Sequence, residues 1–213
     1  EIITNYKKNN YKVIVVSSAM GGVTNELIKK SYEISKNFSE SEYDVLVSSR
    51  EQVACSLIAG RLIHKGYKSR SWLPWQLPII TKGQHKNSRI NQVNKNKIIK
   101  YLKEGGIPII TGFQGINNEN RVTTIGRGGS DASAIMIAKF FKAERCVIYT
   151  DVEGVYTTDP NKLANAKKIK EISYEEMLEM ASLGAKVMQP HSIQDARLNR
   201  IGIDVRSSFK KSS

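Results

Sequence analysis

A glycine-rich loop within residues 123–134, TTIGRGGSDASA, holds the residue types best suited to chemistry in this sequence. Arg127 stands between glycines, and Ser130 and Asp131 open an alanine-rich segment with helical character. Glycine allows a loop to press its backbone N–H groups against a ligand. A helix N-terminus adds unpaired donors and a partial positive charge. The loop therefore predicts a binding site for an anion.

Three other loops contain groups that could join such a site: SSAMGGVTN at 17–25, GFQG at 112–115 and TDVEGVYTTDP at 150–160. In the first, Ser18 and Thr24 could bind a carboxylate or a phosphate, although the spacing fits neither GxxxxGK[ST] nor GxGxxG. In the third, Asp151 could bond a ribose or base, and Tyr156 could flank an adenine. A plain structural turn is the alternative interpretation of both loops.

Phosphoryl transfer is the chemistry that these loops suit when taken together, because it needs mainly cations and N–H donors around the moving group. Lys186, in SLGAKVMQP, could serve as such a cation, or could only satisfy carbonyls at a helix end. Glu51 and Asp131 could hold an ammonium or orient a lysine. The histidines are too scattered to predict a protein-held metal: His64, His85 and His191.

Composition limits the class of protein. The chain has 213 residues, of which 40% are hydrophobic and 25% charged, as expected for one globular domain. It has no membrane-length apolar run and no signal-peptide core at its start, and Cys55 and Cys146 suggest free thiols, so we expect a cytoplasmic protein. The net charge of +13 indicates either polyanion binding or a lysine-rich solvated surface. Because the lysines are scattered along the sequence, we favour the solvated surface and expect no nucleic-acid partner.

Strand-like and helix-like segments alternate along the chain. Apolar runs at 12–18, 107–115 and 145–151 are typical of buried strands, and helices are expected at 21–36, 41–66, 91–106, 130–143 and 173–186. This alternation predicts an α/β fold with a mainly parallel sheet between helical layers. Ligands of such sheets bind beyond the carboxyl ends of the strands, where the four loops lie.

Five runs of the sequence, in order, resemble the signatures of aspartokinases in the amino-acid kinase superfamily: VVSSAMGGVTN, PIITGFQG, TTIGRGGSDASA, YTDVEGVYTTDP and SLGAKVMQPHS. The resemblance is weaker to glutamate 5-kinase and uridylate kinase. It implies a three-layer α/β/α sandwich and ATP-dependent phosphorylation of the L-aspartate side chain to 4-phospho-L-aspartate. That reaction leads to lysine, diaminopimelate, threonine and methionine.

The resemblance also implies roles for individual residues. Arg127 would bind the α-carboxylate of aspartate and Glu51 its amino group, and the rest of that pocket would be Ser18, Thr24, Phe113, Gln114, Gly128, Gly129 and Ser130. ATP, carrying Mg²⁺ on its phosphates, would be bound by Thr150, Asp151, Tyr156 and Lys186. Lys186 would also reach the transferred phosphoryl group, and Asp131 would orient a lysine.

Several positions depart from the aspartokinase pattern. The family begins with a strand leading into a KFGGTS-type phosphate loop and continues into ACT regulatory domains, and neither is found in 1–213. Asn161 replaces an arginine, Arg50 a glycine and Gln189 a histidine. We therefore expect a single kinase domain, truncated at both ends and weakly active alone, which could form a homodimer or associate with a fragment carrying the missing parts. A degenerate remnant or a non-catalytic ligand-binding subunit is the alternative.

Overall fold

The computed structural model describes residues 1–159, 162–185 and 187–209, apart from the side chains of Val23 and Thr24. The chain divides into two compact units, Glu1–Ser133 and Ala134–Ser213. The boundary between them falls inside helix α5 (Gly129–Phe141). Each unit has its own sheet structure and is described separately.

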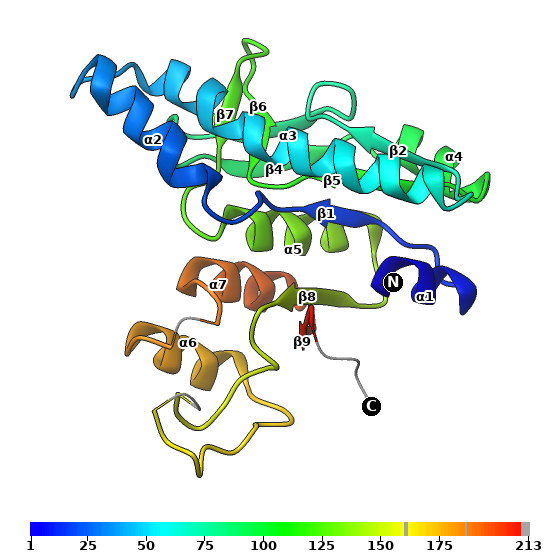
Figure 1. Ribbon diagram of the computed structural model, residues 1–213, viewed down its shortest axis with the longest axis vertical. Coiled ribbons are helices and arrows are strands. Elements are labelled where there is room, and N and C mark those ends of the chain that lie inside the picture. Colours follow the sequence, from blue (N-terminus) through cyan, green and yellow to red (C-terminus); the bar gives the residue numbers. More distant parts are fainter. Residues whose placement is uncertain (160–161, 186, 210–213) are drawn as a thin grey trace. The chain divides into compact units, whose positions relative to one another are not determined.

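The first unit contains a parallel sheet of three strands in the order β1 (Val15–Ser17), β5 (Ile107–Thr111) and β2 (Ser69–Trp72). Every residue of β5 is buried, as its continuous apolar sequence predicts for a central strand. The long helix α3 (Glu40–His64) packs on this sheet (Figure 1). Its Cys55, Ala59 and Leu62 form a buried cluster with Ile107 and Ile109 of β5.

A second, four-stranded sheet in the same unit has the order β4 (Arg89–Val93), β3 (Ile79–Lys82), β6 (Gln114–Ile116) and β7 (Val122–Thr124). Strand β3 pairs antiparallel with β4 and parallel with β6, while β6 and β7 form an antiparallel pair. Strands β5 and β6 belong to different sheets, although only Gly112 and Phe113 separate them in the sequence. The remaining helices of the unit are α1 (Ile2–Lys8), α2 (Val23–Ile34) and α4 (Asn96–Lys103).

The second unit is built on the parallel pair β8 (Cys146–Thr150) and β9 (Ile203–Ser207). Helices α6 (Tyr174–Ser182) and α7 (Pro190–Asn199) pack against each other, and their apolar faces join the core around Ile148. A capping box begins α6: the Glu176 amide donates to the Ser173 hydroxyl, and the Ser173 amide donates to the Glu176 carboxylate.

Most elements lie where the sequence predicts them, and the α/β class with mainly parallel pairing is confirmed. The prediction of one helix over 91–106 is wrong at its start, because residues up to Val93 form β4 and the helix begins at Asn96. Helices α1 and α7 are additions that the sequence pattern does not predict. Within the described residues, no helix combines the length and apolarity that crossing a bilayer requires.

Candidate active site

Three of the predicted loops meet at Gly112. Its amide donates a hydrogen bond of 2.9 Å to the carbonyl oxygen of Ser17, at the end of β1. A Cβ atom at Gly112 would lie 2.8 Å from that oxygen and 3.1 Å from the Cβ and Oγ of Ser130, at the start of α5. Contacts this close require glycine. The structure thus brings the carboxyl ends of β1 and β5 together with the loop that contains Arg127.

Phe113 adopts a backbone conformation that bulky residues rarely take, with a φ of 66°. Its amide donates to the hydroxyl of Ser133 at 3.0 Å, and its carbonyl accepts from the amide of Ile125 at 2.9 Å. A Cβ atom on Gly129 would lie 2.8 Å from the Phe113 ring. The hydrogen bonds to its amide and carbonyl thus hold Phe113 in a strained backbone conformation. Such strain is typical of binding and catalytic loops.

Glu51 is the most unusual acidic residue near this junction. It lies on α3 with 2% of its surface exposed, and the backbone N–H of Ala19, in the 17–25 loop, hydrogen-bonds to it. Burial raises the pKa of Glu51 to about 7, although the neighbouring Arg50 opposes this shift. Its Oε2 has no hydrogen-bond partner among the described residues. A buried, unsatisfied carboxylate oxygen is costly, and a cationic ligand would satisfy it.

Arg50 is itself buried and helps to shape this region. Its Nη2 lies 3.6 Å from Oε1 of Glu51, and its guanidinium lies 5.1 Å from the centroid of the Phe113 ring. Gln114, also buried, donates from Nε2 to the carbonyl of Ser48 at 2.9 Å and accepts from Gln52 at 3.3 Å. These contacts fix the start of β6 to α3.

Most of the other predicted substrate residues of the first unit are more accessible, although Gly129 is buried. Ser18 and Arg127 are exposed, and Arg127 lies between Gly126 and Gly128, which have φ values of 77° and 67°. Asp131, in the first turn of α5, is half-buried, and burial raises its pKa. The predicted role of Thr24 concerns a side chain outside the described residues.

The residues predicted to bind the nucleotide lie in the second unit. Thr150 ends β8, where its carbonyl accepts from the amide of Ser208 at 2.7 Å, and its hydroxyl donates to Asp151 at 2.9 Å. Tyr156 is half-buried and forms an isolated β-bridge with Lys168. Lys186 and Asn161 lie outside the described residues, so the predicted pairing of Lys186 with Arg127 in one pocket stays a prediction.

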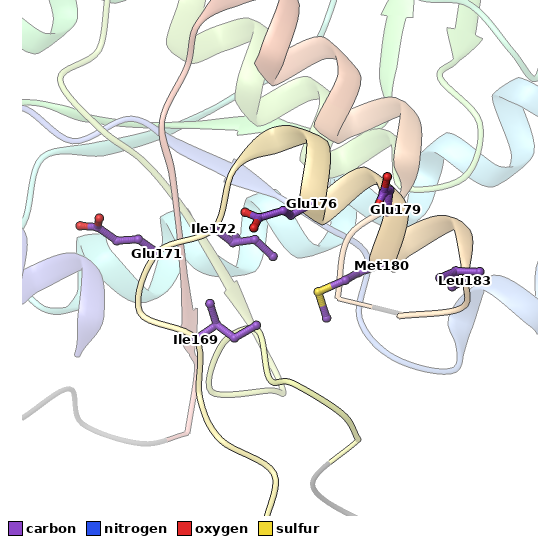
Figure 2. Close-up of a pocket in the computed structure, with 7 residues that line it drawn as sticks. All are labelled: Ile169, Glu171, Ile172, Glu176, Glu179, Met180 and Leu183. Carbon is purple, nitrogen blue, oxygen red and sulfur yellow. The ribbon is translucent and has the colours of Figure 1, made fainter.

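The second unit also contains a shallow cavity of about 350 Å³, which is separate from the candidate active-site residues (Figure 2). Its lining combines three acidic residues, Glu171, Glu176 and Glu179, with the apolar residues Ile169, Ile172, Met180 and Leu183. None of the residues that line it is a predicted site residue. Hydrogen bonds from the backbone and side chain of Ser173 lower the pKa of Glu176, which is a helix-capping role. The described residues contain no group of three or more His, Cys, Asp or Glu suited to a metal ion.

Sequence reasoning misses Asp44 and does not single out Gly112 or Ser133. Asp44 is fully buried and lies two helical turns before Glu51. Positions 44, 47, 51 and 54 follow the helical period, and all four are buried. That pattern could have placed Asp44 on the inner face of α3 together with Glu51.

A parallel α/β sheet with candidate binding loops at the carboxyl ends of its strands is compatible with several classes of enzyme, and comparison with known families distinguishes among them. The sequence matches the Amino acid kinase family over residues 1–207, so the chain belongs to that family. Among its relatives are aspartokinases, as the five motifs predict. The aspartokinase of Rickettsia felis is 50% identical over 205 residues, which are 95% of this chain and 51% of that protein. The chain thus spans about half the length of the curated relatives that it matches.

Solved structures give the same result. The aspartate kinase from Synechocystis aligns with a TM-score of 0.85 and 38% identity, covering 99% of this chain and 35% of the other. Aspartokinase III of E. coli, in complex with aspartate and ADP, aligns with a TM-score of 0.74 and 32% identity, covering 88% of this chain and 44% of the other. The predicted fold class is therefore confirmed.

Proposed function

We propose that this chain is the kinase region of an aspartokinase, which transfers the γ-phosphoryl group of Mg·ATP to the side-chain carboxylate of L-aspartate. The product is 4-phospho-L-aspartate. One observation carries the proposal beyond family membership: the unsatisfied Oε2 of Glu51 lies in a buried carboxylate that also contacts the loop after β1. An amino-acid ammonium is a cation that suits this position, and a structure of the related E. coli aspartokinase III contains aspartate and ADP.

The first unit would bind aspartate. Glu51 accepts from the ammonium group, and Arg127 pairs with the α-carboxylate, since a guanidinium can bind a carboxylate through two N–H groups. The other side chains and amides that we assign to this pocket are Ser18, Thr24, Phe113, Gln114, Gly128, Gly129 and Ser130.

The second unit would bind the nucleotide through Thr150, Asp151 and Tyr156, with Mg²⁺ entering as part of Mg·ATP. An oxygen of the aspartate side chain then attacks the γ-phosphorus, and the bond to the oxygen that bridges to ADP breaks. Lys186 stabilises the charge on the moving phosphoryl group, and Asp131 would orient the lysine of a KFGGTS-type phosphate loop, which residues 1–213 do not contain. Such cations contribute about 10³- to 10⁵-fold to phosphoryl transfer.

The product is an acyl phosphate, an activated carboxylate that a reductase can use. We place this step at the entry to lysine, diaminopimelate, threonine and methionine biosynthesis, in the cytoplasm.

Hydroxylamine trapping tests the activity, because it converts an acyl phosphate into a hydroxamate, whose complex with added ferric iron is coloured. Purified protein with ATP, Mg²⁺ and aspartate should release ADP and form aspartyl hydroxamate in equal amounts. Arg127→Ala and Lys186→Ala should each reduce the rate by about 10²-fold or more. Lys139→Ala, which removes an exposed cation from α5, is the matched control. Equal rates in all four proteins would refute the assigned roles.

Ligand binding without turnover is the second candidate function, and the position of Arg50 favours it. Its guanidinium already lies beside the carboxylate that we assign to the substrate ammonium. Calorimetric titration combined with hydroxylamine trapping separates the two functions. A catalytic chain binds aspartate and also forms hydroxamate, whereas a binding subunit gives the heat of binding and no hydroxamate. If Arg50 obstructs the pocket, Arg50→Gly should strengthen aspartate binding.

A further inference from the structure

Asp44 is a buried carboxylate that joins three segments distant in the sequence. From α3 it is hydrogen-bonded to Nδ1 of His85 at 2.7 Å, and it accepts from the amide of Lys86 at 3.1 Å. It also accepts from the amide of Thr124 at 3.1 Å and from the Thr124 hydroxyl at 2.6 Å. None of its surface is exposed. Both oxygens of the carboxyl group thus take part in hydrogen bonds.

Thr124 is the residue through which Asp44 reaches the glycine-rich loop. It is the last residue of β7, and β7 lies at the end of its sheet with β6 as its strand neighbour. Asp44 satisfies the amide of Thr124, and the backbone and side chain of Ser88 donate to its carbonyl at 3.0 and 2.8 Å. Backbone groups at the edge of a sheet need a hydrogen-bond partner in place of a further strand. Asp44 and Ser88 supply these partners to Thr124.

The segment that contains His85 and Lys86 also supports the loop directly. Gly126 turns with a φ of 77°, and a Cβ atom there would lie 3.2 Å from the carbonyl oxygen of Lys86. Asp44 therefore fixes both the residue that precedes the loop and the segment that packs behind its first glycine.

We propose that Asp44 is a positioning residue for substrate binding. Through Thr124 and Lys86 it fixes the position of the backbone that carries the amides of residues 126–130 and the side chain of Arg127. This inference depends on the proposed function, in which that loop binds aspartate. A displacement of about 1 Å at such a loop is enough to lower binding or catalysis strongly. Asp44 is fully buried in the first unit, whereas the residues that we assign to the nucleotide belong to the second, so its loss should weaken aspartate binding and leave ADP binding unchanged.

Paired variants of Thr124 test the link while leaving Asp44 unchanged. Thr124→Val keeps the size of the side chain and loses the hydroxyl that donates to Asp44, whereas Thr124→Ser keeps that donor. Asp44→Asn removes one acceptor oxygen. Glu42→Gln is the control on the same helix, because Glu42 forms an exposed ion pair with Arg121 instead.

Two measurements on the full chain then decide: calorimetric Kd values for aspartate and ADP, and hydrogen exchange of the amides at 124–130. We expect Thr124→Val and Asp44→Asn to raise the aspartate Kd by about 10-fold and to speed exchange in the loop, with the ADP Kd within about twofold. Thr124→Ser and Glu42→Gln should match the wild type in all three.

The inference is overturned if Thr124→Val stays folded and matches Thr124→Ser in aspartate Kd and in loop exchange. It is also overturned if the ADP Kd rises as much as the aspartate Kd, since that is the result of a general structural defect. A wild-type protein that binds no aspartate contradicts the proposed function instead. Loop exchange in Thr124→Val and Thr124→Ser then decides alone whether Asp44 positions the loop.

Discussion

At the scale of single residues, Glu51 and Phe113 are each held in a state that folding alone disfavours. Glu51 is a carboxyl group without full hydrogen bonding in the interior, and Phe113 is an aromatic residue with left-handed backbone. Arg50 contacts both of them. Local conflicts that stability does not explain are expected at functional sites, so these residues mark the centre of the candidate site more clearly than any sequence motif does.

The raised pKa of Glu51 predicts how stability changes with pH. The pKa rises from 4.5 to about 7 on folding, so the folded protein binds more protons than the unfolded chain in this window. Wild-type stability should therefore fall as pH rises from about 4.5 through about 7, whereas Glu51→Gln should lack this loss. The variant should gain up to about 3 kcal/mol relative to the wild type above about pH 7. Urea unfolding at about pH 5 and about pH 8 measures the difference.

Binding of aspartate should show the opposite trend. The substrate ammonium prefers the ionised carboxylate, so aspartate affinity should rise with pH through about 7 in the wild type, and this rise should be absent in Glu51→Gln. Glu42→Gln, on the exposed side of the same helix, is the control. A pH-independent difference in stability between the wild type and Glu51→Gln would show that the carboxyl does not titrate in this range.

Some residues of the candidate site can be predicted from the sequence, and others cannot. The positions of the loops at 112–115 and 123–134 are predictable, because glycine-rich loops after apolar strands identify the carboxyl end of a sheet. That Phe113, Gln114 and Ser130 line a substrate pocket is implied by the resemblance to aspartokinases and stays a prediction. Asp44 is not predictable, because its importance depends on His85 and Thr124, which are 41 and 80 residues away in the sequence. Contacts over such separations come from tertiary structure, which local patterns do not contain.

At the scale of secondary structure, the interruption between β5 and β6 organises the site. The apolar pattern predicts one strand over 107–115, but Gly112 and Phe113 divide this segment between two sheets. A residue with a φ of 66° cannot continue a strand, and periodicity does not reveal such a conformation in a phenylalanine. Similarly, residues 89–93 are strand because β3 pairs with them, which overrides their helical neighbours in the sequence.

The convergence of β1, β5 and α5 predicts that Gly112→Ala is destabilising. The added methyl group would lie 2.8 Å from the Ser17 carbonyl oxygen. The backbone must therefore move, at a cost of about 1–3 kcal/mol. Gly60→Ala is the control, because no atom lies within 4 Å of its Cβ position and it is inside α3. Alanine within a helix is more stable than glycine by about 1 kcal/mol. Denaturant titration should move the two variants in opposite directions, and a neutral Gly112→Ala would contradict the close packing.

At the scale of the whole molecule, the fold class is predictable because alternating apolar strands and amphipathic helices have few stable arrangements. Membership of the amino acid kinase family confirms that reasoning. The division into two compact units is not predictable in the same way. It falls inside α5, whose sequence is uniformly suited to a helix and gives no composition change at the boundary.

The net charge of +13 predicts only weak, non-specific attraction to nucleic acid. Many cations are paired with carboxylates at separate places, among them Lys29, Lys68, Lys86, Arg121 and Arg197. Binding to a duplex of arbitrary sequence should therefore be lost between about 50 and about 200 mM salt. Fluorescence anisotropy with labelled DNA measures this. Saturable binding that persists at about 150 mM salt, and that aspartate does not displace, would instead support the polyanion-binding alternative.

The left-handed turn at Phe113 also bears on how this protein can change. Glycine at position 113 would release the backbone tension, yet it would remove the ring that lies between Arg50 and Gly129. The left-handed backbone costs about 1–2 kcal/mol, whereas truncating a packed phenylalanine costs about 3–5 kcal/mol. The contacts of the ring thus outweigh the strain at position 113, so drift toward glycine there should be rare.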